Sequence, residues 1–206
     1  MAKRLYRLAT KLASVIPAWL FRVQTKCIVC LPRSRWSDVS DQHTRIGGKD
    51  DEAELERLWP PDVVSSRFER GSMVVVYEED RRIVGGMWFD RVAPRYEKWL
   101  QIHIPHHVRW VNDVVVDPEF RGRGIAGRLG SLGRAKLPPD IEAVAAVITG
   151  LNDASRRSAE KSGYSSTCVF YVRIAGVTAA RLPWGWRVGL WRERKPLHLN
   201  LGDLVG

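Results

Sequence analysis

The sequence feature that most constrains the fold is an arginine- and glycine-rich loop between two apolar segments. Residues 108–117 contain five valines and a tryptophan and end in the apolar run Val114–Val116, which predicts a strand. Residues 121–124 are Arg-Gly-Arg-Gly, and Ile125, Leu129 and Leu132 then recur at helical spacing. The first turn of a helix has unpaired N–H groups, and glycines let a ligand approach the backbone. This strand–loop–helix unit therefore predicts a site for an anion such as a pyrophosphate.

The rest of the chain predicts a mixed order of strands and helices. We expect strands at 21–31, 73–77, 83–89, 143–149 and 167–174, and helices at 50–59, 125–137 and 154–162. Residues 90–108 are expected to form a surface excursion that ends in a strand. The order predicts an α/β (α+β) fold with a mixed, mostly antiparallel central sheet flanked by helices. The 206 residues, 45% of them apolar, are enough for one such domain and exclude a disordered chain.

The charge of the chain is concentrated at its N-terminus. Residues 1–36 contain eight basic residues and no acidic one, although the whole chain has a net charge of +10. Leucines at helical spacing in residues 1–20 predict a basic amphipathic helix. Three interpretations stay open: the helix packs on its own domain, residues 1–22 bind an anionic membrane surface, or the helix binds nucleic acid. We expect three regions, namely the arm (1–20), the main domain (21–175) and a basic, Trp-rich extension of that domain (176–206).

The cysteines predict a reduced setting. Three cysteines cannot form a disulfide framework, so we expect a cytoplasmic protein. Cys27 and Cys30 lie in an apolar strand without a second pair of metal ligands, and Cys168 lies in another, so we expect all three to pack in the core. No apolar run reaches the roughly 18 residues of a membrane-spanning helix, and any membrane contact would be peripheral, at the inner face.

Two motifs resemble the GNAT (N-acetyltransferase) acyltransferase superfamily. Arg121-x-x-Gly124-x-Ala126 is similar to that family's R/Q-x-x-G-x-G/A signature for the coenzyme A pyrophosphate. The segment from Asn152 to Tyr164 is similar to its Asn-x-x-Ala/Ser helix followed by Lys-x-Gly-Tyr. The resemblance spans about residues 72–174, with a strand between the two motifs.

The resemblance implies acetyl-CoA, or another acyl-CoA, as co-substrate and no metal. It implies that the phosphates bind the loop and that the pantetheine arm lies along the preceding strand. The implied cofactor-binding residues are Val114, Val115, Val116, Arg121, Gly122, Arg123, Gly124, Ile125, Ala126, Gly127, Asn152, Ser155 and Arg156.

The catalytic positions depart from the pattern of many family members. Asn112-Asp113 stands where many carry Glu-Asp, and Asn112 cannot accept a proton. Asp113 can, but strand alternation turns it away from the neighbouring face unless a bulge intervenes. Ala159 stands where many members have a tyrosine acid, which leaves Ser155, Ser158, Tyr164 or a water molecule. Histidines before the strand offer another base, or belong to a surface loop: His103, His106 and His107.

Three functions follow as hypotheses. The first is an N-acyltransferase, most simply an N-acetyltransferase, that acts on an amine of a small molecule or of an envelope or sugar precursor. The second is a protein or aminoacyl-tRNA acetyltransferase. The third is a non-catalytic coenzyme A-binding protein, which Asn112 and Ala159 favour. The acceptor and the oligomeric state stay open, and a homodimer through the Trp-rich tail is one expectation.

Overall fold

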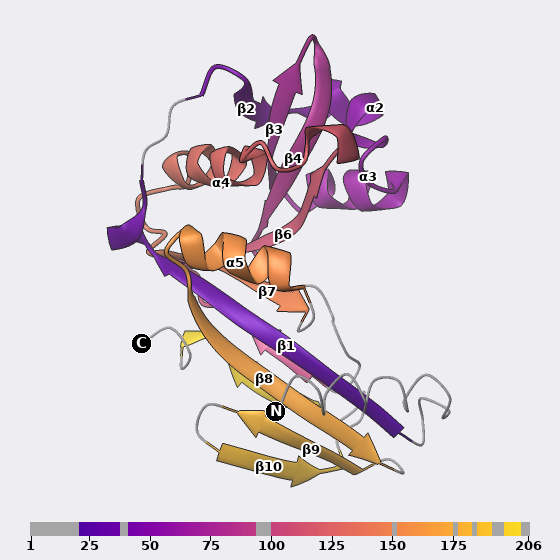
Figure 1. Ribbon diagram of the computed structural model, residues 1–206, viewed down its shortest axis with the longest axis vertical. Coiled ribbons are helices and arrows are strands. Elements are labelled where there is room, and N and C mark those ends of the chain that lie inside the picture. Colours follow the sequence, from indigo (N-terminus) through magenta and orange to yellow (C-terminus); the bar gives the residue numbers. More distant parts are fainter. Residues whose placement is uncertain are drawn as a thin grey trace. The chain divides into compact units, whose positions relative to one another are not determined.

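The computed structural model describes residues 21–37, 41–93, 100–149, 152–174, 177–182, 185–190 and 196–202 (Figure 1). The chain forms two compact units, each described by itself. The central unit comprises residues 30–93 and 104–146, and the terminal unit comprises residues 1–29, 94–103 and 147–206. The amphipathic helix expected over residues 1–20 lies outside the described residues.

The central unit is a sheet with helices on both faces. Its strands follow the order β2-β3-β4-β6-β7, antiparallel except for the β6–β7 pair. Its strands are β2 (Thr44–Gly47), β3 (Met73–Glu79), β4 (Arg82–Asp90), β6 (Val108–Val116) and the first part of β7 (Ala143–Thr149). Its helices are η1 (Arg33–Arg35), η2 (Lys49–Asp51), α2 (Glu52–Leu55), α3 (Pro61–Glu69), η3 (Pro118–Phe120) and α4 (Ile125–Ala135).

Strand alternation places different residues against the two helical layers. In the core of α2 and α3, Val74, Val76 and Trp88 pack with Leu55 and Val64. The alternate residues of the same strands meet α4, whose Gly133 faces Phe89 and Val75. Figure 1 shows α4 on one side of the β3–β4 hairpin and α3 on the other. The fully apolar runs in β3 and β4 therefore reflect a sheet that is buried on both faces.

The helices near residue 60 differ from the sequence expectation. The helix expected over 50–59 is two short pieces, η2 and α2, followed by turns to Trp59. Pro60 and Pro61 follow these turns, and Pro61 is the first residue of α3. A proline fits the first helical turn because the missing N–H would have no intrahelical acceptor there. No helix was expected over residues 61–69, so α3 is an addition to the sequence expectation.

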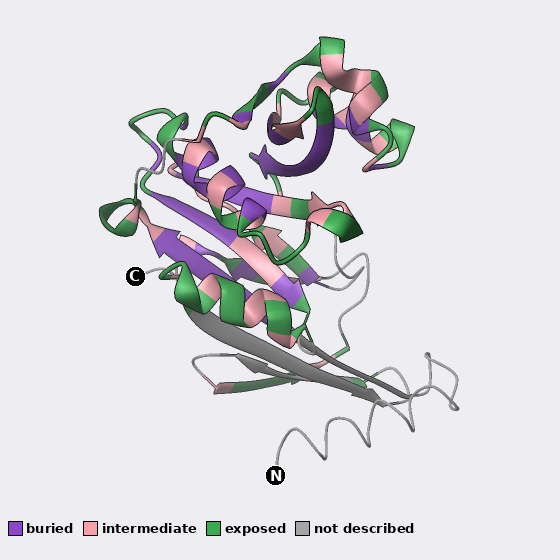
Figure 2. Ribbon diagram, turned by 45° about the horizontal axis from the view of Figure 1, so that its top comes forward, coloured by how far each residue is buried: buried purple, intermediate pink, exposed green. Residues whose placement is uncertain are grey.

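The terminal unit is a second group of strands with one helix. Its strands follow the order β10-β9-β8-β1, and β11 pairs in parallel with β5. The strands are β1 (Phe21–Pro32), β5 (Leu100–His103), β8 (Ser165–Ile174), β9 (Val177–Leu182), β10 (Gly185–Gly189) and β11 (Leu197–Asn200). The helix α5 (Asp153–Lys161) has no buried residue, as Figure 2 shows. The strands after residue 176 were not expected from the Trp-rich sequence.

The expected fold class and the strands expected from the sequence are confirmed. A mixed, mostly antiparallel sheet is flanked by helices, and the strands at 21–31, 73–77, 83–89, 108–117, 143–149 and 167–174 are present. Cys27 and Cys30 are buried thiols, and burial raises the pKa of the Cys30 thiol to about 11. Both cysteines of β1 are core residues, while the side chain of Cys168 lies outside the described residues.

Candidate active site

The loop between β6 and α4 is shaped by two glycines. Gly122 and Gly124 have φ of 81° and 77°, a left-handed conformation that other residues rarely adopt. A Cβ built at Gly122, Gly124 or Gly127 would meet no atom within 4 Å. The glycines are therefore required by backbone conformation, and the space in front of the first turn of α4 is open.

Five consecutive backbone N–H groups of this loop have no acceptor in the described structure. They belong to Gly122, Arg123, Gly124, Ile125 and Ala126; the next N–H groups, of Gly127 and Arg128, donate to the carbonyl of Gly124. Unpaired N–H groups at the start of an eleven-residue helix carry the positive end of its dipole. The loop can therefore bind a diphosphate through its backbone, as its sequence predicts.

The arginines around the loop divide into two kinds. Arg121 donates through Nε to the carbonyl of Val116 at 3.0 Å, and the Arg123 guanidinium lies 4.8 Å from the Phe120 ring; both side chains are exposed. Arg128 instead pairs with Asp41 at 3.0 Å and donates to the Tyr77 hydroxyl. Arg121 is thus accessible to an anion, and so is Arg123, although Arg123 also lies 3.6 Å from the Glu79 carboxylate. Arg128 instead ties α4 to the sheet.

Strand β6 separates from β7 before it reaches the loop. The parallel register runs only from Val108–Ala143 to Trp110–Ala145, while β4 remains paired with β6 as far as Val116. Val114 is about half exposed, and Val115 and Val116 are partly buried. In the described structure the edge of β6 from Val114 to Val116 therefore has no strand beside it, although Arg121 donates to the Val116 carbonyl. An extended ligand can pair with this edge, as expected for the pantetheine arm.

A β-bulge interrupts β6 at Asp113. Gly86 pairs with Val115 and Trp88 pairs with Asn112, so Asp113 and Val114 together lie opposite Met87. Asp113 has a φ of 43°, which only a few non-glycine residues adopt. The bulge that the sequence analysis required for Asp113 to change face is present.

Two side chains from the α2–α3 region hold the bulge. The Trp59 indole N–H donates to the Asp113 carbonyl at 3.2 Å, and Arg67 Nη2 donates to the Asp113 carboxylate. Trp59 reaches the bulge across Gly86, where a Cβ would lie 2.5 Å from the indole ring. The backbone at Asp113 is thus fixed by residues about 50 positions earlier in the chain. We call Trp59 and Arg67 the bulge clamp.

The clamp includes buried polar atoms without partners. Arg67 and Asp90 are both buried, and the Arg67 Nε lies 3.9 Å from Asp90 Oδ2. Asn112 donates to the same oxygen at 3.4 Å. In the described structure Arg67 Nη1, Trp88 Nε1 and Asp90 Oδ1 have no hydrogen-bond partner. Buried polar groups without a partner are rare in folded proteins, so these three atoms mark the packing around Arg67 as unusual.

The expected catalytic residues differ in what they offer. Asn112 is half-buried and bonded to Asp90, so it orients a neighbour and carries no proton. The Asp113 side chain is 49% exposed and one of its oxygens is occupied by Arg67. Its other oxygen leaves Asp113 able to contact an amine.

The second motif lies in the terminal unit. The Asn152 side chain accepts from the backbone N–H of Ser155 at 3.0 Å, an N-cap of α5. Arg156 pairs with Asp153 at 3.2 Å. Ala159 provides no acidic group. These residues form a regular helix start, with Asn152 as its N-cap.

The histidines fall into two pairs. His103 on β5 and His198 on β11 stack, with 2.7 Å between Nε2 and Nδ1. His106 and His107 meet edge to face in the turn before β6. Neither pair contacts Asp113 in the described structure, so no histidine is assigned a catalytic role.

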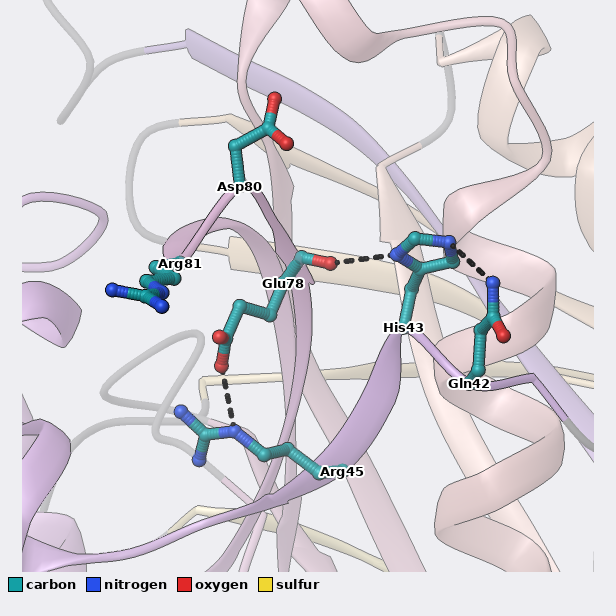
Figure 3. A pocket seen from close by; sticks show the side chains of 6 residues that line it. All are labelled: Gln42, His43, Arg45, Glu78, Asp80 and Arg81. Carbon is teal, nitrogen blue, oxygen red and sulfur yellow. Dashed lines mark hydrogen bonds and ion pairs between the residues drawn. The ribbon is translucent and has the colours of Figure 1, made fainter.

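A polar pocket of about 350 Å³ lies beside the β3–β4 turn (Figure 3). Figure 3 shows Arg45 paired with Glu78 and the His43 ring bonded to the Glu78 carbonyl. The Arg45 guanidinium also binds Asp51 through two hydrogen bonds and holds the pKa of that carboxyl below its usual value. Arg45 and Glu78 are therefore engaged by neighbouring side chains, whereas Asp80 and Arg81 line the pocket without a partner in Figure 3.

Metal and membrane features can be assessed only for the described residues. There, no three His, Cys, Asp or Glu side chains are grouped to hold a metal ion. In the same part of the chain, no helix is long and apolar enough to cross a membrane.

Comparison with known proteins agrees with the fold. The profile of the acetyltransferase (GNAT) family matches residues 36–164. A GNAT-family acetyltransferase from Colwellia psychrerythraea is similar over 74% of this chain and 55% of its own, with 13% identity and a TM-score of 0.53. A GNAT-family structure from Novosphingobium aromaticivorans has 19% identity over 74% of this chain and 65% of its own, with a TM-score of 0.54.

A third structure, a conserved protein of unknown function from Staphylococcus epidermidis, has 12% identity over 79% of this chain and 65% of its own, with a TM-score of 0.56. The chain thus spans 65% or less of the length of these three proteins. Comparison with curated protein sequences gives no significant match.

Proposed function

The chain belongs to the acetyltransferase (GNAT) family, and we propose that it transfers an acyl group from acyl-CoA, most simply acetyl-CoA, to an amine. The observation that carries the proposal is the row of five acceptor-free N–H groups from Gly122 to Ala126. In this proposal, the backbone N–H dipoles stabilise the negative charge of the bound diphosphate, and the exposed guanidinium groups of Arg121 and Arg123 lie beside it.

The free edge of β6 supports the next step. In this proposal, the pantetheine arm pairs with Val114–Val116, which brings the thioester towards the bulge. A backbone N–H of Val114 or Val115 then donates to the thioester oxygen as charge develops on it. The amine nitrogen attacks the carbonyl carbon, the C–S bond breaks, the thiolate takes up a proton and an amide forms.

Asp113 is the residue that we propose to contact the acceptor amine. Its carboxylate is half exposed, and the bulge clamp fixes its position. With Asn112 unable to take a proton, Asp113 orients the amine and accepts its proton, directly or through water. A thiol of ordinary acidity is an adequate leaving group, so Ala159 in place of an acid slows the reaction without preventing it. A water molecule is the proposed proton donor to the thiolate.

The distribution of charge along the chain indicates the class of the acceptor. The basic segment over residues 1–22 supports a cytoplasmic enzyme that works at an anionic membrane face, where amino-sugar and lipid-linked precursors are found. A protein or aminoacyl-tRNA acceptor would need a basic surface near the site, but the central unit has 16 basic and 18 acidic residues. We therefore favour a small amine.

The experiment incubates the purified chain with acetyl-CoA and a panel of primary amines that includes amino sugars, amino acids and peptides. Release of the coenzyme A thiol and the mass of the acetylated amine are measured. We expect one amine class to yield an amide, and the Asp113→Asn variant to turn over more slowly by about 10²-fold.

A second candidate is a non-catalytic acyl-CoA-binding protein. Two observations favour it, namely the engagement of Asp113 by Arg67 and the alanine at position 159. Binding of acetyl-CoA without an acetylated product from any amine class would establish this candidate and contradict the enzyme.

A further inference from the structure

The exposed apolar side chains of the protein gather on one hairpin of the terminal unit. Seven large apolar residues are exposed in the described structure, and four of them belong to β9, β10 and the residue after β10. These are Val177 (45% exposed), Trp186 (57%), Val188 (68%) and Leu190 (57%). The other three, Ile46, Val92 and Val114, are isolated from one another in the sequence.

The four residues lie on one face of the hairpin. Trp186, Val188 and Leu190 alternate along the strand, so their side chains point to the same side. The register pairs Val188 with Ala179, and Val177 alternates with Ala179 along β9. Directly opposed residues of an antiparallel pair share a face. We call this shared face the hairpin face; its apolar members are Val177, Ala179, Trp186, Val188 and Leu190. The register also pairs Trp186 with Arg181, so a basic residue stands at the register position beside the tryptophan.

The strand that carries this face is the last of its sheet. The strand order ends at β10, as Figure 1 shows, and Figure 2 shows exposed residues along it. Soluble proteins usually place charged residues on such an edge strand. Here only Arg187 is charged, and alternation puts it on the opposite side from Trp186 and Val188. An apolar face of this kind indicates a surface that contacts a partner.

The charge of the terminal unit indicates what that partner is. This unit has 17 basic and 5 acidic residues, a formal charge of +12, whereas the central unit has a charge of −2. A second copy of the same unit would repel this charge. Valine and leucine gain nothing from nucleic-acid bases, which stack on aromatic rings. A surface that is both anionic and apolar matches the charge and the hairpin face together.

We propose that the hairpin face inserts into the headgroup region of an anionic membrane. Trp186 lies at the interface between headgroups and acyl chains, a position that tryptophan prefers. Val188 and Leu190 bury their side chains, and the basic residues of the terminal unit contact the lipid phosphates. This surface is distinct from the donor loop, so membrane binding and coenzyme A binding are separable.

The experiment is co-sedimentation of the full chain with vesicles made of equal parts phosphatidylglycerol and phosphatidylcholine. The wild type binds them more tightly than vesicles of phosphatidylcholine alone, and added salt weakens but does not abolish binding. The triple variant Trp186→Ser, Val188→Ser, Leu190→Ser binds at least about tenfold more weakly. The matched control is Val92→Ser, which removes an equally exposed valine from the central unit.

Further measurements decide between the partners. The single variant Val188→Asp changes one exposed side chain on an edge strand, keeps the fold and weakens vesicle binding in the same direction. Coenzyme A binding stays unchanged in both variants, which separates this proposal from the proposed function. The proposal is overturned by triple-variant binding equal to wild type, by binding to a single-stranded oligonucleotide but not to vesicles, or by loss of a dimer with vesicle binding retained.

Discussion

The loop that follows β6 and the bulge within β6 are stabilised in different ways. The loop from Gly122 to Ala126 depends on backbone conformation, and its glycines have open space around them. Three residues before the strand ends, Asp113 is held by side chains from α3 and the segment before it. The loop is thus stabilised locally, whereas the position of Asp113 depends on packing between distant segments.

The largest expected effect is on the bulge clamp. Arg67→Ala removes a buried guanidinium and leaves the buried Asp90 carboxylate and Asp113 without their cation. We expect the free energy of unfolding to fall by about 3 kcal/mol. Urea denaturation measures this, with Arg57→Ala, an exposed partner of Glu54, as the control with little effect. A decrease in unfolding free energy below about 1 kcal/mol would show that the buried contacts of Arg67 contribute little to the stability of the fold.

A second substitution tests the clamp from the sheet side. Gly86→Ala places a methyl group against the Trp59 ring and pushes the indole away from the Asp113 carbonyl. We expect a loss of about 2 kcal/mol in stability, because the side chain is forced from a packed position. Gly48→Ala is the control, since a Cβ there meets no atom within 4 Å. Equal stability of the two variants would contradict the close contact.

The donor loop should respond in a different way. Gly122→Ala strains a left-handed residue and costs about 1 kcal/mol of stability. It also adds a methyl group to the open space where we place the diphosphate, so coenzyme A affinity falls by about tenfold. Gly71→Ala is matched in conformation, with a φ of 68° and open space around it, and should leave affinity unchanged. A similar loss of coenzyme A affinity in Gly122→Ala and Gly71→Ala would mean that backbone strain causes the loss. It would contradict a diphosphate bound next to Gly122.

The smallest expected effect lies outside both regions, at Asp51. Arg45 lowers the pKa of this carboxyl by hydrogen bonding, with a further contribution from the Gly48 N–H. Because the pKa of Asp51 is lower in the folded than in the unfolded protein, its ionised carboxylate stabilises the fold at pH values above the unfolded pKa of about 3.9. This stabilisation is lost as the pH falls through the folded pKa. Asp51→Asn should therefore cost about 0.5–1 kcal/mol at pH 7 and almost nothing in strong acid. A pH-independent difference in unfolding midpoints would contradict the ion pair.

The sequence predicted the donor loop because its determinants are consecutive. Arg121 to Ala126 contain both glycines, and the flanking periodicity predicts the strand and the helix. The bulge itself could not be predicted, since no local sequence signal determines the φ of Asp113. The sequence showed only that Asp113 would need a bulge in order to change face. Its partners, Trp59 and Arg67, lie 54 and 46 residues away. These contacts arise from tertiary packing and have no local signal in the sequence. The helix α3 was not predicted because a proline can either end one helix or begin the next.

The most direct test of the donor site is calorimetric titration of acetyl-CoA into the wild type, Gly124→Glu and Gly71→Glu. The first substitution places a carboxylate in front of the acceptor-free N–H groups, and the second makes the same change at another left-handed glycine. We predict that wild type and Gly71→Glu bind acetyl-CoA and that Gly124→Glu binds at least about 10²-fold more weakly. Equal affinity in all three proteins would contradict the assignment of the loop as the diphosphate site.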